Sequence, residues 1–154
     1  MCPPLVKYDN PSKYKIHFEE TYCKTPTLTF DGIKVFFSKN NFEHAFYESS
    51  DRRGSKDIFS IIRAQRIDWI KKTLENASAS IYQGWDKKKK VYMPHRRVSV
   101  VYEDFVVIIS LSLNKTGDLK GKFITCYQAD NSIGKIRNSP IWDKKSCINY
   151  LEGK

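Results

Sequence analysis

The segment from residue 97 to residue 127 limits the possible folds more than any other part of the sequence. It consists of apolar runs rich in Val, Ile and Phe, broken by Glu103-Asp104 and by the polar stretch 114–121. Upstream, residues 81–93 have strand character on both sides of a basic run that looks like a loop tip. Short strands joined by tight turns are typical of an antiparallel meander. The sequence therefore predicts a four-stranded antiparallel sheet.

A hairpin and two helices are expected ahead of this sheet. Asp31-Gly32 lies between two alternating runs, which is a strong hairpin signal. Residues 38–41 supply N-cap residue types for a short helix that begins near residue 41. A longer helix is predicted from residue 55 or 56 to about Asn76. Because the helices precede the main sheet, the predicted class is α+β, with an N-terminal β-hairpin and two helices packed on the sheet.

The length of 154 residues corresponds to about one domain. Within it we distinguish an irregular lead-in and the hairpin at residues 1–40, the helices and the sheet at 41–130, and a C-terminal extension at 131–154. The extension has helical hints near residues 143–151 but is interrupted by Pro140. We expect a single compact domain overall.

The charge balance of the chain indicates which kind of partner the protein binds. The chain has 27 Lys and Arg residues against 17 Asp and Glu, a formal net charge of +10. Such an excess favours a polyanion, and nucleic acid is the first to consider. No window approaches the roughly 18 apolar residues of a membrane span, and the first residues do not resemble a signal peptide. A soluble, cytoplasmic protein is expected, with its four cysteines as reduced, structural thiols.

The residue types favour phosphodiester chemistry without a metal or another cofactor. The acidic residues are dispersed, and His17, His44 and His95 have no metal-ligand spacing. A Gly-rich phosphate loop and a zinc pattern are both absent from the sequence. RNA supplies its own nucleophile, the 2′-hydroxyl. Cleavage beside it needs a base, a proton donor and fixed cations, which His, Tyr, Thr and Arg can provide.

Arg63 and Arg66 fall on or near the apolar side of the longer predicted helix. Two interpretations are open. The arginine stems could cover apolar surface while the guanidinium groups reach a carboxylate or a sheet edge. Alternatively, both could face a phosphate-binding cleft between helix and sheet.

Four segments together resemble a known group of nucleases. These are "FEHAF", the helix "SIIRAQRIDWIKKTLEN", the strand entry "PHRRVSVVY" and the closing run "FVVIISLSLNKTGDLKGKFITCYQAD". Over residues 42–130 the chain resembles phage-type members of the barnase, EndoU, colicin and RelE-like (BECR) ribonuclease superfamily. The closing strand at 122–130 is the most specific part of the likeness. The resemblance implies helices packed on a four-stranded antiparallel sheet, with a metal-independent endoribonuclease site on the concave face of the sheet.

The resemblance also implies site residues. Family positions map onto His44, onto one or both of Arg96 and Arg97, and onto Thr125 and Tyr127. With Arg66 from the helix analysis, the expected catalytic set is His44 as base or acid, Arg66 and Arg97 around the phosphate, and Thr125 and Tyr127 as polar supports. The expected nucleic-acid-binding residues are Arg63, Lys87, Lys88, Lys89, Lys90, Arg96 and Lys122.

Each candidate also has an ordinary structural explanation: a satisfied histidine for His44, a solvated sheet edge for Arg97, and plain strand formers for Thr125 and Tyr127. Side chains alternate between the two faces of a strand, so only one of two adjacent residues can face the cleft. Arg97 has the parity of Ser99 and Val101, so it is favoured over Arg96 for the cleft.

The closing strand has its own parity. Thr125 and Tyr127 are expected on one face with Phe123 in line, and Ile124 and Cys126 are expected on the other face. The two hydroxyl groups would then lie side by side.

The predicted function is a metal-independent endoribonuclease that leaves a 2′,3′-cyclic phosphate, with a phage or mobile-element toxin as one form it could take. The partners to consider are RNA, including transfer RNA, and an immunity or antitoxin protein. The alternative is a non-catalytic basic nucleic-acid-binding module. A third possibility is a protein-interaction or toxin-neutralising role, in which the positive charge is a docking surface for an acidic partner. The enzymatic prediction depends on His44 and the hydroxyl pair lining one positively charged groove.

Overall fold

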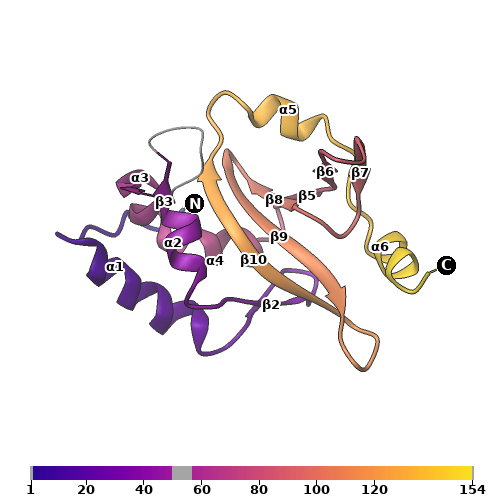
Figure 1. Cartoon of the computed structure of the whole chain (residues 1–154), viewed down its shortest axis with the longest axis horizontal. Coiled ribbons are helices and arrows are strands. Elements are labelled where there is room, and N and C mark those ends of the chain that lie inside the picture. The colour runs from indigo at the N-terminus through magenta and orange to yellow at the C-terminus, as the bar shows by residue number, and fades with distance from the viewer. Residues whose placement is uncertain (1, 50–56, 154) are drawn as a thin grey trace.

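The computed structural model describes residues 2–49 and 57–153. In this part of the chain, the fold is α+β, built on a six-stranded sheet of order β1-β2-β10-β9-β8-β5 (Figure 1). The strands of this sheet are β1 (Thr27–Leu28), β2 (Lys34–Phe36), β5 (Ser80–Tyr82), β8 (Val98–Tyr102), β9 (Phe105–Leu113) and β10 (Leu119–Gln128).

Two short ribbons and several helices complete the described chain. The ribbons are β3 (Tyr47–Glu48) with β4 (Ile58–Phe59), and β6 (Gly84–Asp86) with β7 (Val91–Met93). The helices are α1 (Pro11–Phe18), which continues as the π-helical turn η1 (Glu19–Cys23), α2 (Asn41–Phe46), α3 (Ile61–Gln65), α4 (Ile67–Glu75), α5 (Ile133–Arg137) and α6 (Lys144–Leu151). Among the helices described, none has both the length and the apolar character needed to cross a bilayer.

The predicted four-stranded antiparallel sheet is only part of this larger sheet. Strands β10, β9, β8 and β5 are antiparallel neighbours. Strand β2 adds parallel to β10, with Val35 opposite Gly121, and β1 pairs antiparallel with β2. The hairpin that turns at Asp31-Gly32 is therefore present, but it belongs to the sheet and does not precede it. The sheet is mixed because β2 joins it by a non-local parallel pairing, which strand periodicity does not reveal.

One face of the sheet is covered by helices around an aromatic core. Phe18 is fully buried at its centre, with the ring centroids of Phe37, Phe42, Phe46 and Phe123 at 5.7 to 6.1 Å. Tilted and edge-to-face contacts at such distances stabilise a core beyond simple burial. These rings come from α1, α2, β10 and the segment after β2, so the core ties the N-terminal part of the chain to the sheet.

Residues 11–23 are helical, whereas the sequence predicted an irregular lead-in to about residue 15. The Asn10 side chain accepts a hydrogen bond from the Lys13 N–H at 3.0 Å, and Pro11 occupies the first turn, where its missing N–H is not needed. Helix α1 buries only Tyr14 and Phe18. Such a narrow apolar stripe explains why the helical spacing of apolar residues in this segment is too weak to predict a helix.

The longer predicted helix is both shorter and interrupted. Residues 58–59 form β4, and α3 begins only after Ser60, whose hydroxyl accepts from the Arg63 N–H at 3.4 Å. At Arg66 the backbone leaves helical geometry (φ −98°, ψ 22°) and separates α3 from α4. The predicted start at residue 55 or 56 lies outside the described residues, and β4 contradicts a helix running through residue 58.

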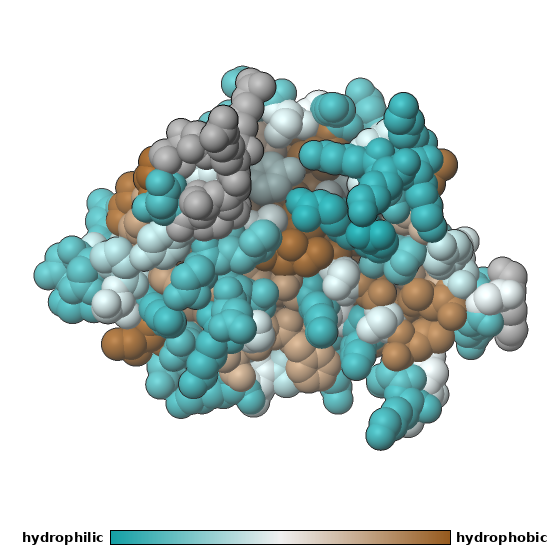
Figure 2. Space-filling model, in the orientation of Figure 1, coloured by the Kyte–Doolittle hydropathy of each residue, from teal (hydrophilic) through white to brown (hydrophobic). Residues whose placement is uncertain are grey.

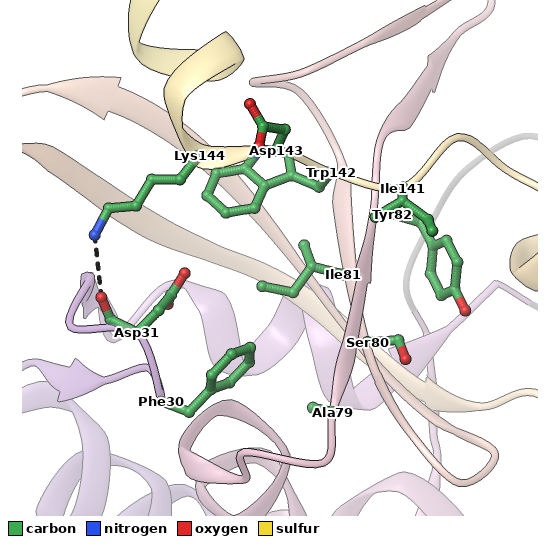
Figure 3. Close-up of a pocket in the computed structure, with 10 residues that line it drawn as sticks. All are labelled: Phe30, Asp31, Ala79, Ser80, Ile81, Tyr82, Ile141, Trp142, Asp143 and Lys144. Atoms are coloured by element: carbon green, nitrogen blue, oxygen red, sulfur yellow. Dashed lines mark hydrogen bonds between the residues drawn. The ribbon is translucent and has the colours of Figure 1, made fainter.

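The C-terminal extension returns to the edge of the sheet. The Trp142 N–H donates to the Ile81 carbonyl at 2.9 Å, which extends the pairing beyond β5. Figure 3 shows Ile81 and Tyr82 pointing to opposite sides of β5, and the Lys144 ammonium reaching the Asp31 carbonyl oxygen at 3.1 Å. Helix α6 matches the predicted helical hints, whereas α5 was not predicted.

Tyr22 offers a test of how η1 supports α4. Its buried hydroxyl donates to the Ile67 carbonyl at 2.6 Å and accepts from the Lys71 N–H at 3.0 Å, both in the first turns of α4. Tyr22→Phe removes this partner from both backbone groups and should lower the free energy of unfolding by about 1–3 kcal/mol in urea denaturation. The exposed Tyr150→Phe should change it by no more than about 0.5 kcal/mol. Equal stability of the two variants would contradict this role of Tyr22.

Candidate nucleic-acid site on the open sheet face

The alternation of β8 separates the two faces of the sheet. Val98 and Val100 point into the aromatic core, whereas Val101 belongs to a second, smaller cluster on the opposite face. We call this opposite side the open face. Arg97 and Ser99 line a cavity on it, so the predicted parity of Arg97 with Ser99 and Val101 is confirmed.

The cavity has a volume of about 510 Å³ and lies between the sheet, the β6–β7 ribbon and α5. Three cations from separate parts of the chain line it, namely Lys87 in the β6–β7 turn, Arg97 directly before β8 and Lys135 on α5. The other lining residues are Gln83, Gly84, Trp85, Tyr92, Ser99, Ile108, Tyr127, Ile136 and Ser139. Of the lining residues that the structure describes, none carries a carboxylate or an imidazole. In the orientation of Figure 1, the surface over β9 and β10 is hydrophobic in the middle and bordered by hydrophilic side chains (Figure 2).

Tyr127 and Arg97 are the two predicted catalytic residues that share this cavity. Burial raises the pKa of the Tyr127 phenol above its ordinary value, while the charges of Arg97 and Arg63 act in the opposite direction. The net effect is a phenol that stays protonated at neutral pH and can donate a hydrogen bond or a proton. Arg97 is exposed, so its guanidinium is accessible to an anion in the cavity.

The backbone of Arg97 is set by a close approach from β6. Arg97 has φ +50°, in the left-handed region that side chains other than glycine rarely adopt. Gly84 packs so tightly against this segment that a Cβ there would collide with the carbonyl oxygens of Arg96 and Arg97. Only glycine fits at this position, and the contact fixes where the Arg97 side chain leaves the sheet.

Trp85 and Tyr92 were not predicted as site residues. They pair across the β6–β7 ribbon, with ring centroids 5.0 Å apart and an interplanar angle of 66°. They remain 46 % and 39 % exposed although they line the cavity. Exposed aromatic rings beside cations are the surface on which unpaired bases stack. The available signal was one aromatic residue close to each end of the basic run.

A β-bulge alters the expected parity of β10. Phe123 pairs with Ile109 and Thr125 pairs with Ile108, so Ile124 is the extra residue. Thr125 and Tyr127 share the open face as predicted, judged by their partners on β9. The prediction was wrong for Phe123, which lies in the aromatic core, and for Ile124, which packs on the open face.

His44 does not line the cavity. Helix α2 packs into the aromatic core through Phe42, Ala45 and Phe46, on the face of the sheet opposite the cavity. His44 is exposed on that helix. The expectation that His44 and the hydroxyl pair share one groove is therefore not met, because the buried residues of α2 place it in the other layer.

Arg63 follows the first of the two interpretations, because it reaches a carboxylate, whereas the described contacts of Arg66 are with the preceding helix α3 and with the Trp69 ring. Arg63 donates to the Ala45 carbonyl at 3.1 Å and lies 3.5 Å from the Glu48 carboxylate. Arg66 donates to the Ile62 carbonyl at 2.9 Å, and its guanidinium carbon lies 5.0 Å from the centroid of the Trp69 ring. Neither side chain lines the cavity, because each reaches a partner on or beside its own helix.

The basic run and Arg96 hold the β6–β7 turn. The Asp86 carboxylate accepts from the Lys88 and Lys89 backbone N–H groups at 3.0 and 3.1 Å, and these bonds hold its pKa below the ordinary value. Arg96 pairs with Asp86 at 3.5 Å and does not line the cavity. Lys87 is the member of the run that lines the cavity, while Lys88, Lys89 and Lys90 are exposed at the turn.

The other two histidines have partners elsewhere. His17 is hydrogen-bonded to the Tyr8 hydroxyl at 2.9 Å and to the Asp68 carboxylate at 2.7 Å. His95 lies against the Tyr150 ring at 4.9 Å, and burial lowers its pKa. Both arrangements connect neighbouring elements and neither contributes to the cavity.

A second pocket, at the edge of the sheet, is less suited to a polyanion. It has a volume of about 360 Å³ between the β1–β2 turn, β5 and the C-terminal extension (Figure 3). It is lined by the carboxylates of Asp31 and Asp143 and by one cation, Lys144. The open-face cavity, with three cations and no acid among its described residues, is the better candidate for phosphate.

Comparisons with known proteins give no further guide to the site. No protein-family model matches the chain, and neither the curated proteins nor the solved structures contain a match. The resemblance noted from the sequence therefore stays a prediction.

Gly84 allows a direct test of how the cavity is built. Gly84→Ala should push the Arg96–Arg97 backbone away from β6 and lower the free energy of unfolding by roughly 1–3 kcal/mol. Gly134→Ala, in α5, has open space around the added methyl group and should be neutral or stabilising by about 0.5–1 kcal/mol. Thermal and urea unfolding measure both. A Gly84→Ala variant as stable as Gly134→Ala would refute the close approach.

Proposed function

We propose that the protein is a metal-independent endoribonuclease and that the open-face cavity is its site. One observation carries the proposal: Arg97, directly before β8, and Tyr127, on β10, line one cavity with Lys87 and Lys135. A cavity with several cations and a phenol that can donate a proton is suited to a phosphodiester. The resemblance of residues 42–130 to BECR ribonucleases supports the same conclusion.

The proposed reaction uses the nucleophile that RNA carries. The 2′-oxygen forms a bond to the adjacent phosphorus, and the bond from phosphorus to the 5′-oxygen breaks, which leaves a 2′,3′-cyclic phosphate and a 5′-hydroxyl. Arg97 and Lys135 stabilise the negative charge that builds on the phosphate oxygens. Tyr127 donates its proton to the departing 5′-oxygen and regains one from water. The 2′-hydroxyl proton passes to hydroxide or water in the open cavity.

The biological setting is part of the proposal. The substrate would be RNA, with transfer RNA among the candidates, and the protein would act in the cytoplasm. If it is a phage or mobile-element toxin, an immunity or antitoxin protein would be needed to cover the open face. Thr125, which shares the open face with Tyr127 but does not line the cavity, would contact the RNA beside the reacting phosphate.

A second candidate function is a nucleic-acid-binding module without catalysis. The observation that favours it is the composition of the cavity, since its described lining residues include no imidazole and no carboxylate that could act as a base. The same cations and the Trp85–Tyr92 pair would then bind RNA without turning it over. Binding without products in the assay below would establish this candidate.

Cleavage in excess chelator is the first test. The wild-type protein should cut single-stranded RNA and leave 2′,3′-cyclic phosphate ends, identified by end-group analysis. Tyr127→Phe should slow cleavage by about 10²- to 10⁴-fold, the usual contribution of a proton donor. Arg97→Ala should slow it by about 10²-fold or more. Lys145→Ala, an exposed lysine outside the cavity, is the control and should behave like wild type. Intact RNA in the wild-type reaction would overturn the proposal.

The pH profile tests which group gives and which takes the proton. If hydroxide accepts the 2′-proton, the rate should rise with pH through the neutral range. It should level off only when the pH exceeds the raised pKa of Tyr127, because the loss of the protonated acid then offsets the gain in hydroxide. A rate that levels off near pH 6.5, the ordinary pKa of an imidazole, and is lost in His44→Ala would instead place the base on α2.

A further inference from the structure

A second groove lies on the open face, apart from the cavity. It has a volume of about 350 Å³ and is lined by Lys34, Phe36, Asn114, Leu119, Lys120 and Lys122. We call it the lysine groove. On β10, Lys120 and Lys122 alternate with the buried Leu119, Gly121 and Phe123, so these lysines face away from the aromatic core. On β2, Lys34 and Phe36 alternate with core residues in the same way.

The arrangement of its charges is unfavourable for the protein alone. Lys34 is directly opposite Lys120 in the parallel pairing of β2 with β10. Like charges at opposed positions destabilise a sheet. No ion pair between described residues includes Lys34, Lys120 or Lys122. An anion between the two strands would relieve this repulsion.

Protection of a sheet edge does not account for these lysines. Exposed edge strands often carry lysine to block aggregation. Here β2 lies between β1 and β10, and β10 lies between β2 and β9. Lys34 and Lys120 therefore face out of an interior part of the sheet, where an edge function does not apply.

Phe36 adds an aromatic surface to the groove. It is 44 % exposed and opposite Lys122 in the pairing of β2 with β10. An exposed ring flanked by lysines can stack on an unpaired base while the lysines contact the backbone phosphates. Bases inside a duplex are not available for such stacking. This combination points to single-stranded nucleic acid.

The two sites lie on one continuous face. Lys122 of the lysine groove and Tyr127 of the cavity are on the same strand, roughly 15 Å apart at the usual rise of a strand. Lys120 and Lys122 are two residues apart, a spacing comparable to that of successive phosphates in an extended strand. An RNA strand that enters the cavity can therefore continue along β10 to Phe36.

We propose that the lysine groove is a second subsite that binds the single-stranded RNA held in the cavity, several nucleotides from the site of cleavage. This inference rests on the proposed function for its ligand, and it adds the substrate class: an extended single strand that is longer than the cavity alone can bind. The lysine groove would add binding affinity and set the direction in which the RNA strand lies, and the cavity would hold the reacting phosphodiester.

Binding measured against oligonucleotide length tests this inference. The ligands are 2′-deoxy-substituted at every position, so that no 2′-hydroxyl can attack, and are a dinucleotide and a single strand of about ten nucleotides. Wild type should bind the longer ligand more tightly. Lys34→Ser with Lys120→Ser should weaken that binding about tenfold. The salt slope, which is the change in log binding constant with log salt concentration, should become smaller by about 0.7 for each phosphate that is no longer neutralised. Phe36→Ala should also weaken it about tenfold. None of these changes should affect the dinucleotide.

The matched control is Lys7→Ser with Lys145→Ser, which removes the same charge from two exposed residues outside both pockets. It should leave the salt slope of the longer ligand unchanged. The inference is overturned if the groove variants bind like this control, if the dinucleotide loses as much affinity as the longer strand, or if a duplex competes as well as a single strand. Failure of cleavage with these binding results intact would reject the enzyme and keep the subsite. Intact cleavage with binding that does not depend on ligand length would keep the enzyme and reject the subsite.

Discussion

The aromatic core on one face of the sheet is the constraint on which the rest of the structure depends. Phe18 and its neighbouring rings require a full layer of helices above β9 and β10. Because strand side chains alternate between faces, burying one set sends the other set to the opposite side. The open face carries a smaller apolar cluster that α5 covers only in part. Its remaining surface is where Arg97, Tyr127 and the lysines of β2 and β10 lie.

The cavity is formed by local features that the sheet alone would not produce. The left-handed backbone at Arg97 and the tight contact of Gly84 bring the β6–β7 ribbon against the start of β8. The bulge at Ile124 keeps Tyr127 on the open face while Phe123 stays in the core. Bulges and unusual backbone angles are common beside functional sites, since they redirect side chains. Here both affect residues of the same cavity.

Much of the sheet could be predicted from the sequence because its signals are local. The strands around Glu103-Asp104 and the hairpin at Asp31-Gly32 follow from alternation and turn residues. Alternation also predicted the side on which Arg97 lies, although its left-handed backbone places it outside the strand. The bulge at Ile124 could not be predicted, because the insertion of a single residue leaves no periodic trace. The parallel pairing of β2 with β10 joins segments more than eighty residues apart, and no local pattern reports it.

The candidate site was predicted only in part for the same reason. Arg97 and Tyr127 do share a cavity, but His44 was assigned to it from chain order and the resemblance, and the packing of α2 places it on the other face. Trp85 and Tyr92 were overlooked because a basic run suggested only a loop, although the ribbon around it presents two rings to the cavity. Contacts between layers decide such placements, and they depend on the whole fold.

The most direct test of the central claim is a crystal structure with a bound, 2′-deoxy-substituted single-stranded oligonucleotide. The account predicts a phosphate within hydrogen-bonding distance of the Arg97 guanidinium, close to the Tyr127 hydroxyl on the open face. An oligonucleotide bound on the α2 side of the sheet, with the open-face cavity empty, would contradict it.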